Sequence, residues 1–216
     1  MNKEEMIEEI KPHTVMNAIG AESIIPPIPG VDKAFVKDSH DVLDGKAEAT
    51  GNVVVIGGGM VGMETAEYLA EKGAKVSVLE MLPDICSDMG TTRKICMGEE
   101  IQKSGIIPVT SVKVTEIGDN VVIGEKDGEK VEFPCDYAVM AVGARKRDGS
   151  ALEKMCNDLE IGYYEIGDAG MARRALNAVR EAFDAALNFD KEEEYKYVSK
   201  PKKVVFITGA TGTMGQ

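Results

Sequence analysis

Residues 53–62 read VVVIGGGMVG, from Val53 to Gly62, and this stretch decides the fold. Its first four residues are apolar and β-branched, which predicts a short strand buried on both faces. The glycines predict a tight turn into a helix that ends at Gly73 and has Met63, Ala66 and Leu69 on one face. A second buried strand follows at 75–79. The order strand, turn, helix, strand predicts an α/β fold around a parallel sheet.

The glycines in this stretch have the GxGxxG spacing of a dinucleotide-binding loop. Gly57 allows the tight turn, Gly59 lets a pyrophosphate approach the backbone, and Gly62 lets the helix pack closely on the strand. The phosphates would bind the free N–H groups at the helix N-terminus. The candidate cofactor-binding residues of this Rossmann-type loop are Gly57, Gly58, Gly59, Met60, Val61 and Gly62.

Glu80 follows the second strand, where a carboxylate binds the hydroxyls of the adenine ribose. A carboxylate there repels a 2′-phosphate, and no Lys or Arg occurs between Glu80 and Arg93 to attract one. We therefore expect NADH to bind in preference to NADPH. The alternative is a glycine-rich turn that binds no ligand.

The pattern changes in the second half of the chain. Residues 111–134 alternate between apolar and polar side chains, with turn signals at 119–120 and 127–128, and predict an inserted antiparallel β-meander. Buried strands are predicted at 137–142 and 161–168. A helix is predicted at 171–189, with an apolar stripe formed by Ala172, Ala175, Val179, Ala182, Phe183 and Ala186. Upstream, we expect a helix at 4–10, a strand at 14–19 and a proline-rich extended connector at 24–30, followed by a polar stretch.

The last residues begin a second motif. Residues 191–203 are highly charged and predict a linker. The apolar strand 204–207 then leads into TGATGTMG, residues 208–215, which resembles the start of a short-chain dehydrogenase/reductase. Because a natural protein seldom stops one residue into a helix, we expect the sequence to be part of something longer.

Composition limits the function classes. The formal net charge of −12 argues against nucleic acid or an anionic membrane as a partner. No signal peptide or membrane-spanning apolar run is present, so a cytoplasmic location is expected. The spacing of the four cysteines predicts buried, reduced thiols rather than a redox or iron–sulfur motif. His13 and His40 stand apart, and no metal site is predicted.

A longer series of motifs resembles one family. The series is Asn17-Ala18-Ile19-Gly20, Pro29-Gly30, the Gly57 loop through Glu64, Ala141-Val142-Gly143, Gly167-Asp168 and the Ala-rich last helix. It resembles the pyridine-nucleotide:flavin oxidoreductases, and most of all the C-terminal FAD/NAD(H)-binding portion of old yellow enzyme-like reductases of the 2,4-dienoyl-CoA reductase and enoate reductase type. The resemblance covers residues 1–190. It implies that Glu64 and Glu80 join the loop in binding NAD(H), that Gly143 closes this pocket, and that Asp168, after Gly167, bonds the ribityl chain of a flavin.

Two features depart from the family pattern. Ile19 replaces the usual Thr, and no glycine loop for the FAD pyrophosphate precedes residue 50. FAD would then need a missing N-terminal portion or another chain, and we expect a preparation with little or no flavin. The predicted domain plan is a partial FAD-binding-like sheet (1–50 and 144–190), an NAD(H)-binding Rossmann domain with the meander (51–143), the charged linker (191–203) and the second motif (204–216).

The sequence therefore predicts an NADH-binding, electron-input portion of a flavin-dependent oxidoreductase, cut from a larger ene-reductase-like enzyme. No catalytic side chain is identified, because the cofactors carry hydride transfer. The alternatives are a non-catalytic dinucleotide-binding module and the N-terminal partner of a short-chain dehydrogenase. We also predict that strand 204–207 pairs in parallel with the strand ending at Gly20 or at Gly167, within one chain or swapped between two copies.

Overall fold

The computed structural model describes the fold of residues 3–87, 90–188 and 204–208. The chain divides into two compact units. Unit 1 comprises Met1–Glu22 and Ala144–Gln216, and unit 2 comprises Ser23–Gly143. Within the described ranges, no helix is long and apolar enough to cross a membrane.

Unit 2 is built around the predicted parallel sheet. Its five strands have the order β3-β10-β4-β5-β6, and all adjacent pairs are parallel. The elements are β3 (Val36–Asp38), α2 (Ser39–Leu43), β4 (Asn52–Ile56), α3 (Met60–Glu71), β5 (Lys75–Leu79), α4 (Thr91–Ser104), β6 (Ile107–Val109) and β10 (Tyr137–Met140). The predicted strand, glycine turn, helix and strand at 53–79 are thus confirmed.

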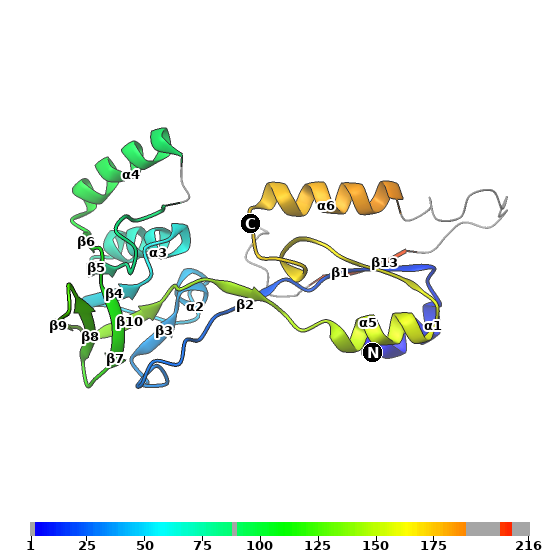
Figure 1. Cartoon of the computed structure of the whole chain (residues 1–216), viewed down its shortest axis with the longest axis horizontal. Coiled ribbons are helices and arrows are strands. Elements are labelled where there is room, and N and C mark those ends of the chain that lie inside the picture. Colours follow the sequence, from blue (N-terminus) through cyan, green and yellow to red (C-terminus); the bar gives the residue numbers. More distant parts are fainter. Residues whose placement is uncertain (1–2, 88–89, 189–203, 209–216) are drawn as a thin grey trace. The chain divides into compact units, whose positions relative to one another are not determined.

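Two layers cover this sheet, and Figure 1 shows them on opposite sides. On one face, residues of α2, α3 and α4 pack against β4 and β5. On the other face lies the predicted meander of β7 (Lys113–Ile117), β8 (Val121–Lys126) and β9 (Glu129–Pro134), antiparallel throughout. Its second turn follows the expected chemistry, since Asp127 and Gly128 both have positive φ.

The region before β4 differs from the prediction. The polar stretch expected there contains β3 and α2, and β3 pairs with β10 from Val36 opposite Ala138 to Asp38 opposite Met140. Unit 2 consequently begins at Ser23, whereas the predicted Rossmann domain begins at 51. A three-residue strand is too short to show a period of two, which is why the sequence pattern did not indicate it.

Unit 1 contains a three-stranded parallel sheet of order β12-β1-β13. The strands are β1 (Thr14–Ala18), β12 (Gly162–Glu165) and β13 (Val204–Thr208). β13 pairs with β1 from Thr14 opposite Val204 to Ala18 opposite Thr208. The predicted pairing of the tail strand with the strand ending at Gly20 is confirmed, within a single chain. A separate two-stranded sheet joins β2 (Ala21–Ser23) and β11 (Ala144–Lys146).

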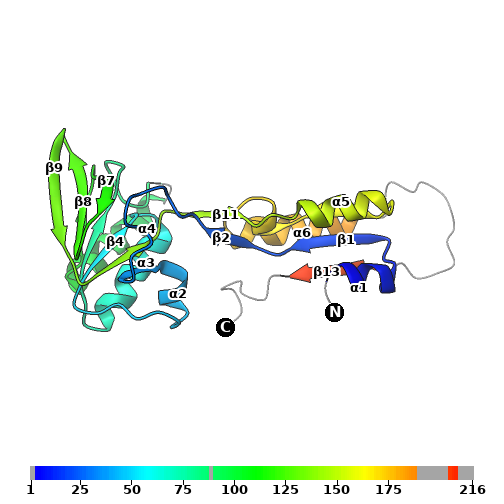
Figure 2. The ribbon, with the colours of Figure 1, turned by 90° about the horizontal axis from the view of Figure 1, so that it is seen from below.

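Helices cover both faces of the unit 1 sheet (Figures 1 and 2). On one side α1 (Lys3–Ile10) and α5 (Ser150–Asp158) pack through Ile7, Leu152 and Cys156. On the other side α6 (Ala175–Asn188) packs through Ala182 and Ala185. The sequence analysis did not predict α5.

The prediction for the last helix needs two corrections. α6 begins at Ala175 rather than at 171, because a 3₁₀ turn, η1 (Gly167–Ala169), and an irregular segment precede it. Val179 and Phe183 were expected to face the core, yet they are 66% and 63% exposed. Small alanines face the sheet instead. The predicted linker, 191–203, and the glycine-rich residues 209–216 lie outside the described residues.

Candidate functional site

The glycine loop joins β4 to α3 and depends on two close backbone approaches. Gly57 has φ of +111°, and a Cβ on it would overlap the carbonyl of Ala141. A Cβ on Gly62 would overlap the carbonyl oxygen of Gly57. Glycine at these two positions is therefore required by packing of the loop, whether or not a ligand is bound.

Gly59 differs from both, because a Cβ built there meets nothing within 4 Å. It is the N-cap of α3, with φ of −74° and ψ of −176°, and provides no side-chain cap. The first turn of α3 contains no acidic residue. N–H groups at a helix start lack intrahelical partners and lie at the positive end of the helix dipole. This open, uncapped helix start is suited to binding an anion such as a pyrophosphate.

Glu80 lies beside this loop, as predicted. Its Oε2 accepts a hydrogen bond from the Gly58 N–H at 2.6 Å, and its Oε1 accepts one from the Leu82 N–H at 2.7 Å. The two bonds hold the half-buried carboxylate in one orientation at the end of β5. An ionised carboxylate accepts about four hydrogen bonds, so capacity remains for sugar hydroxyls.

The other predicted residues fall into two groups. Met60 and Val61 form the first turn of α3, with Glu64 exposed one turn later, and Gly143 follows β10, the neighbour of β4. These residues share unit 2 with the loop. Gly167 and Asp168 belong to unit 1. There the exposed Asp168 carboxylate accepts a hydrogen bond from the Arg173 N–H at 3.1 Å.

Sequence reasoning missed two apolar side chains beside Glu80. Met81 and Leu82 follow it directly and are 63% and 44% exposed. Exposed apolar side chains next to a ribose-binding carboxylate offer a surface on which a flat base can pack. The available signal was the pair of apolar residues that directly follows Glu80, the predicted ribose-binding acid.

A Ser–His–Asp cluster also lies in unit 2, at the start of α2. Both Ser23 Oγ and Asp38 Oδ1 lie near His40 Nδ1, at 3.1 and 3.5 Å. In a catalytic triad the serine and the carboxylate contact opposite ring nitrogens, so this arrangement does not activate Ser23. Asp38 instead caps α2 by accepting hydrogen bonds from the backbone N–H groups of His40 and Asp41.

These contacts shift two pKa values. Burial alone would raise the pKa of Asp38, but hydrogen bonds from His40 and Ser23 outweigh it and bring the pKa to about 2. The hydrogen bond to Asp38 raises the pKa of His40, to which the nearby Asp41 and Asp44 also contribute. The cluster therefore strengthens as His40 gains a proton.

The described thiols show no sign of catalytic activation. Cys86, Cys135 and Cys156 are buried thiols that form no disulfide with one another, as predicted; the side chain of Cys96 lies outside the described residues. Burial raises the pKa of the Cys135 thiol to about 11 and also raises that of Cys156. A nucleophilic cysteine needs the opposite shift.

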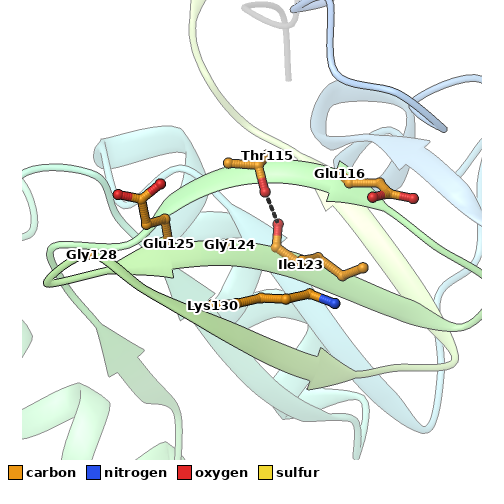
Figure 3. A pocket seen from close by; sticks show the side chains of 7 residues that line it. All are labelled: Thr115, Glu116, Ile123, Gly124, Glu125, Gly128 and Lys130. Carbon is orange, nitrogen blue, oxygen red and sulfur yellow. Dashed lines mark hydrogen bonds between the residues drawn. The ribbon is translucent and has the colours of Figure 1, made fainter.

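A shallow hollow of about 310 Å³ lies on the meander, where Figure 3 shows its lining residues. Thr115 and Glu116 come from β7, Ile123 and Glu125 from β8, and Lys130 from β9. No residue of the glycine loop lines it. The hollow is therefore not the dinucleotide site.

The parallel sheet, the tight glycine turn, the uncapped start of α3 and the oriented Glu80 define a Rossmann-type dinucleotide-binding protein. The profile of the pyridine nucleotide-disulphide oxidoreductases matches residues 2–175. The chain belongs to this family of flavoprotein oxidoreductases, which bind NAD(H) and FAD.

Relatives with assigned activities and a solved structure agree with this membership. The chain is 42% identical over 185 residues to a bilirubin reductase of Mediterraneibacter gnavus and 40% identical over 187 residues to an NADH oxidase of Thermoanaerobacter brockii. Each match covers 84% of this chain but only 28% and 29% of the respective relative. A 2-naphthoyl-CoA reductase complex superposes with a TM-score of 0.78 at 28% identity, over 84% of this chain and 28% of that one. The chain thus spans less than a third of the length of these relatives.

Proposed function

We propose that this chain is the NADH-binding, electron-input part of a flavin-dependent oxidoreductase of the ene-reductase type. NADH binds with its pyrophosphate on the first turn of α3 and its adenine ribose on Glu80. Hydride then passes to a flavin, and electrons leave the flavin for a substrate bound by another part of the enzyme.

The open N-terminus of α3 carries this proposal. Its first-turn N–H groups have neither a side-chain cap nor an acidic neighbour, and the space over Gly59 is free of other atoms. A structural glycine turn needs Gly57 and Gly62 but does not need an open Gly59. In the proposal that opening, together with the uncapped helix start, accommodates the pyrophosphate.

The side chains of this site bind and orient, while the cofactors supply the redox chemistry. The flavin accepts a hydride equivalent, which requires only that the nicotinamide ring be placed against it. Glu80 fixes the adenosine end through hydrogen bonds that a 2′-phosphate would disrupt by charge repulsion. This arrangement favours NADH over NADPH.

The test is direct binding followed by electron transfer. NADH and NADPH are titrated into the purified chain and followed by nicotinamide fluorescence; NADH should bind at least about tenfold more tightly, which corresponds to about 1.4 kcal/mol. NADPH binding with equal or greater affinity would contradict the role given to Glu80. In Glu80→Gln the orienting contacts to Gly58 and Leu82 survive in part while the charge is lost, so its preference for NADH should shrink.

Electron transfer distinguishes the proposal from a non-catalytic dinucleotide-binding module. With FAD added, NADH should reduce a dye acceptor, and this activity should fall in a Gly59 variant that no longer binds NADH. NADH binding without any flavin-dependent dye reduction would favour the non-catalytic module.

A further inference from the structure

The five parallel strands of unit 2 have their carboxyl ends along one edge of the sheet. Asp38, the last residue of β3, lies opposite Met140 of β10, and Met140 lies opposite Ile56 of β4. On the other side of β4, Ile56 lies opposite Leu79, the last residue of β5. Neighbouring strands are about 4.8 Å apart. β3 therefore ends about 10 Å from β4, on the side away from β5.

A dinucleotide at the proposed site would extend along this edge in both directions from the glycine loop. Glu80, directly after β5, would bind the adenine ribose one strand spacing from the loop, and Met81 and Leu82 lie beyond it. The nicotinamide half repeats the same order of phosphate, ribose and base on the other side of the loop. Its ribose would then lie at the end of β10, near Gly143, and its ring beside the end of β3.

His40 lies at this end of the edge. It is the second residue of α2, which follows β3 and packs with α3 on the same face of the sheet. Its neighbour Ser23 is tied to Gly143, because the next residue, Ile24, donates its backbone N–H to the Gly143 carbonyl oxygen at 3.0 Å. His40 and Gly143 therefore contact the same short segment, residues 23–24.

The two nitrogens of the His40 ring have different surroundings. Nδ1 lies 3.1 Å from Ser23 Oγ and 3.5 Å from Asp38 Oδ1, and these contacts orient the ring. Within the part of the chain that the structure describes, Nε2 bonds no protein group, and the side chain is 38% exposed. Because the Asp38 carboxylate favours a proton on Nδ1, Nε2 accepts a hydrogen bond in the neutral ring and donates one in the imidazolium.

We propose that His40 is a further NADH-binding residue, whose Nε2 forms a hydrogen bond with the carboxamide of the nicotinamide ring. A primary carboxamide carries an acceptor oxygen and donor N–H groups, so it can pair with Nε2 in either protonation state. The bond holds the ring that gives up the hydride in one orientation. This inference rests on the proposed function, since it takes NADH to bind along this edge.

ADP-ribose isolates this contact, because it has the adenosine, pyrophosphate and second ribose of NADH but no nicotinamide. Both compounds are titrated into the purified chain by isothermal titration calorimetry. His40→Phe removes both ring nitrogens. It should weaken NADH binding about fivefold, the ratio that one net hydrogen bond gives, and leave ADP-ribose binding unchanged.

Two amide variants separate the nitrogens of the ring. Asparagine places its amide where Nδ1 lies and can keep the contacts to Ser23 and Asp38, but it does not reach the position of Nε2. Glutamine reaches that position with a donor and an acceptor. His40→Asn should therefore lose NADH affinity as His40→Phe does, and His40→Gln should recover part of it. Should His40→Phe fail to fold, this pair carries the comparison.

Two controls test whether the effect is specific. His13→Phe makes the same substitution at an exposed position of unit 1 and should leave both affinities unchanged. Glu80→Gln acts on the adenosine end and should weaken NADH and ADP-ribose binding by the same factor. Only variants of His40 should separate the two ligands.

The outcomes distinguish this inference from the proposed function. NADH binding that is lost in Gly59→Asp but unchanged in His40→Phe and His40→Asn would overturn the inference alone. Equal weakening of NADH and ADP-ribose in the His40 variants would also overturn it, because His40 would then act through the structure of the site. NADH binding that Gly59→Asp leaves unchanged would refute the proposed site and this inference with it.

Discussion

Replacing Gly59 with aspartate should change stability and cofactor binding in opposite directions. Gly59 is the N-cap of α3 in extended conformation, and a side chain added there meets nothing within 4 Å. An aspartate fits that geometry and can accept hydrogen bonds from the free N–H groups of the first turn. The gain over glycine is a few tenths of a kcal/mol from capping plus about 0.3–1 kcal/mol from the helix dipole. The melting temperature of unit 2 should rise by about 1–4 °C.

The same carboxylate would occupy the place of the pyrophosphate and repel it. Two unit charges 4 Å apart interact by about 4 kcal/mol at an effective dielectric constant of 20. NADH affinity should therefore fall by more than about 100-fold, or about 2.8 kcal/mol. Gly59→Asn caps the helix without the charge and should lose less affinity, and Asn120→Asp, in a turn of the meander, controls for net charge. A Gly59→Asp variant that is more stable yet still binds NADH normally would refute the assignment of the phosphate to this helix.

Three further predictions concern stability. Gly62→Ala should destabilise the protein by about 1–3 kcal/mol in chemical unfolding, because its Cβ overlaps the carbonyl oxygen of Gly57; a neutral effect would contradict the described loop. Tyr163→Phe should cost about 1–3 kcal/mol in the same assay, since the fully buried Asn17 amide donates to the Tyr163 hydroxyl at 2.7 Å and would lose that acceptor. Because the folded-state pKa of His40 is raised above 6.5, its stabilising contribution is complete below pH 6.5 and is lost as the pH rises through the folded pKa. The difference in melting temperature between the wild type and His40→Gln should shrink over that range, and a constant difference would show that the imidazole does not act by charge.

The parts of the fold that could be predicted are those in which a local pattern has one physical solution. Residues 53–80 combine a β-branched run, a glycine turn and a periodic helix, and they fold as predicted. The Asp127-Gly128 turn was equally determined, because positive φ at both positions is characteristic of a two-residue hairpin. In both cases neighbouring residues alone decide the conformation.

The parts that could not be predicted depend on distant partners. β3 is only three residues long and is recognisable as a strand only through its pairing with β10. The buried face of α6 was misassigned because its apolar arc is wider than the sheet can cover. Gly167 has φ of +60°, and a Cβ on it would come within 2.9 Å of Ala178, so α6 approaches this turn closely through an alanine, while Val179 and Phe183 stay exposed. Periodicity identifies an apolar arc but not which half of it the sheet covers.

The net charge of the chain acts on a ligand at long range, whereas the groups of the binding site act on it at short range. A chain with a formal charge of −12 repels a dianion at long range, but that repulsion is screened beyond about 8–10 Å at physiological ionic strength. Within that distance, a pyrophosphate at the proposed site would interact with backbone N–H groups and the dipole of α3, whose first turn has no acidic side chain. The Glu80 carboxylate beside the loop accepts hydrogen bonds from the N–H groups of Gly58 and Leu82. The acidic composition therefore argues against polyanionic surfaces, which need a broad basic footprint, and is compatible with a dinucleotide, which needs only one well-placed helix start.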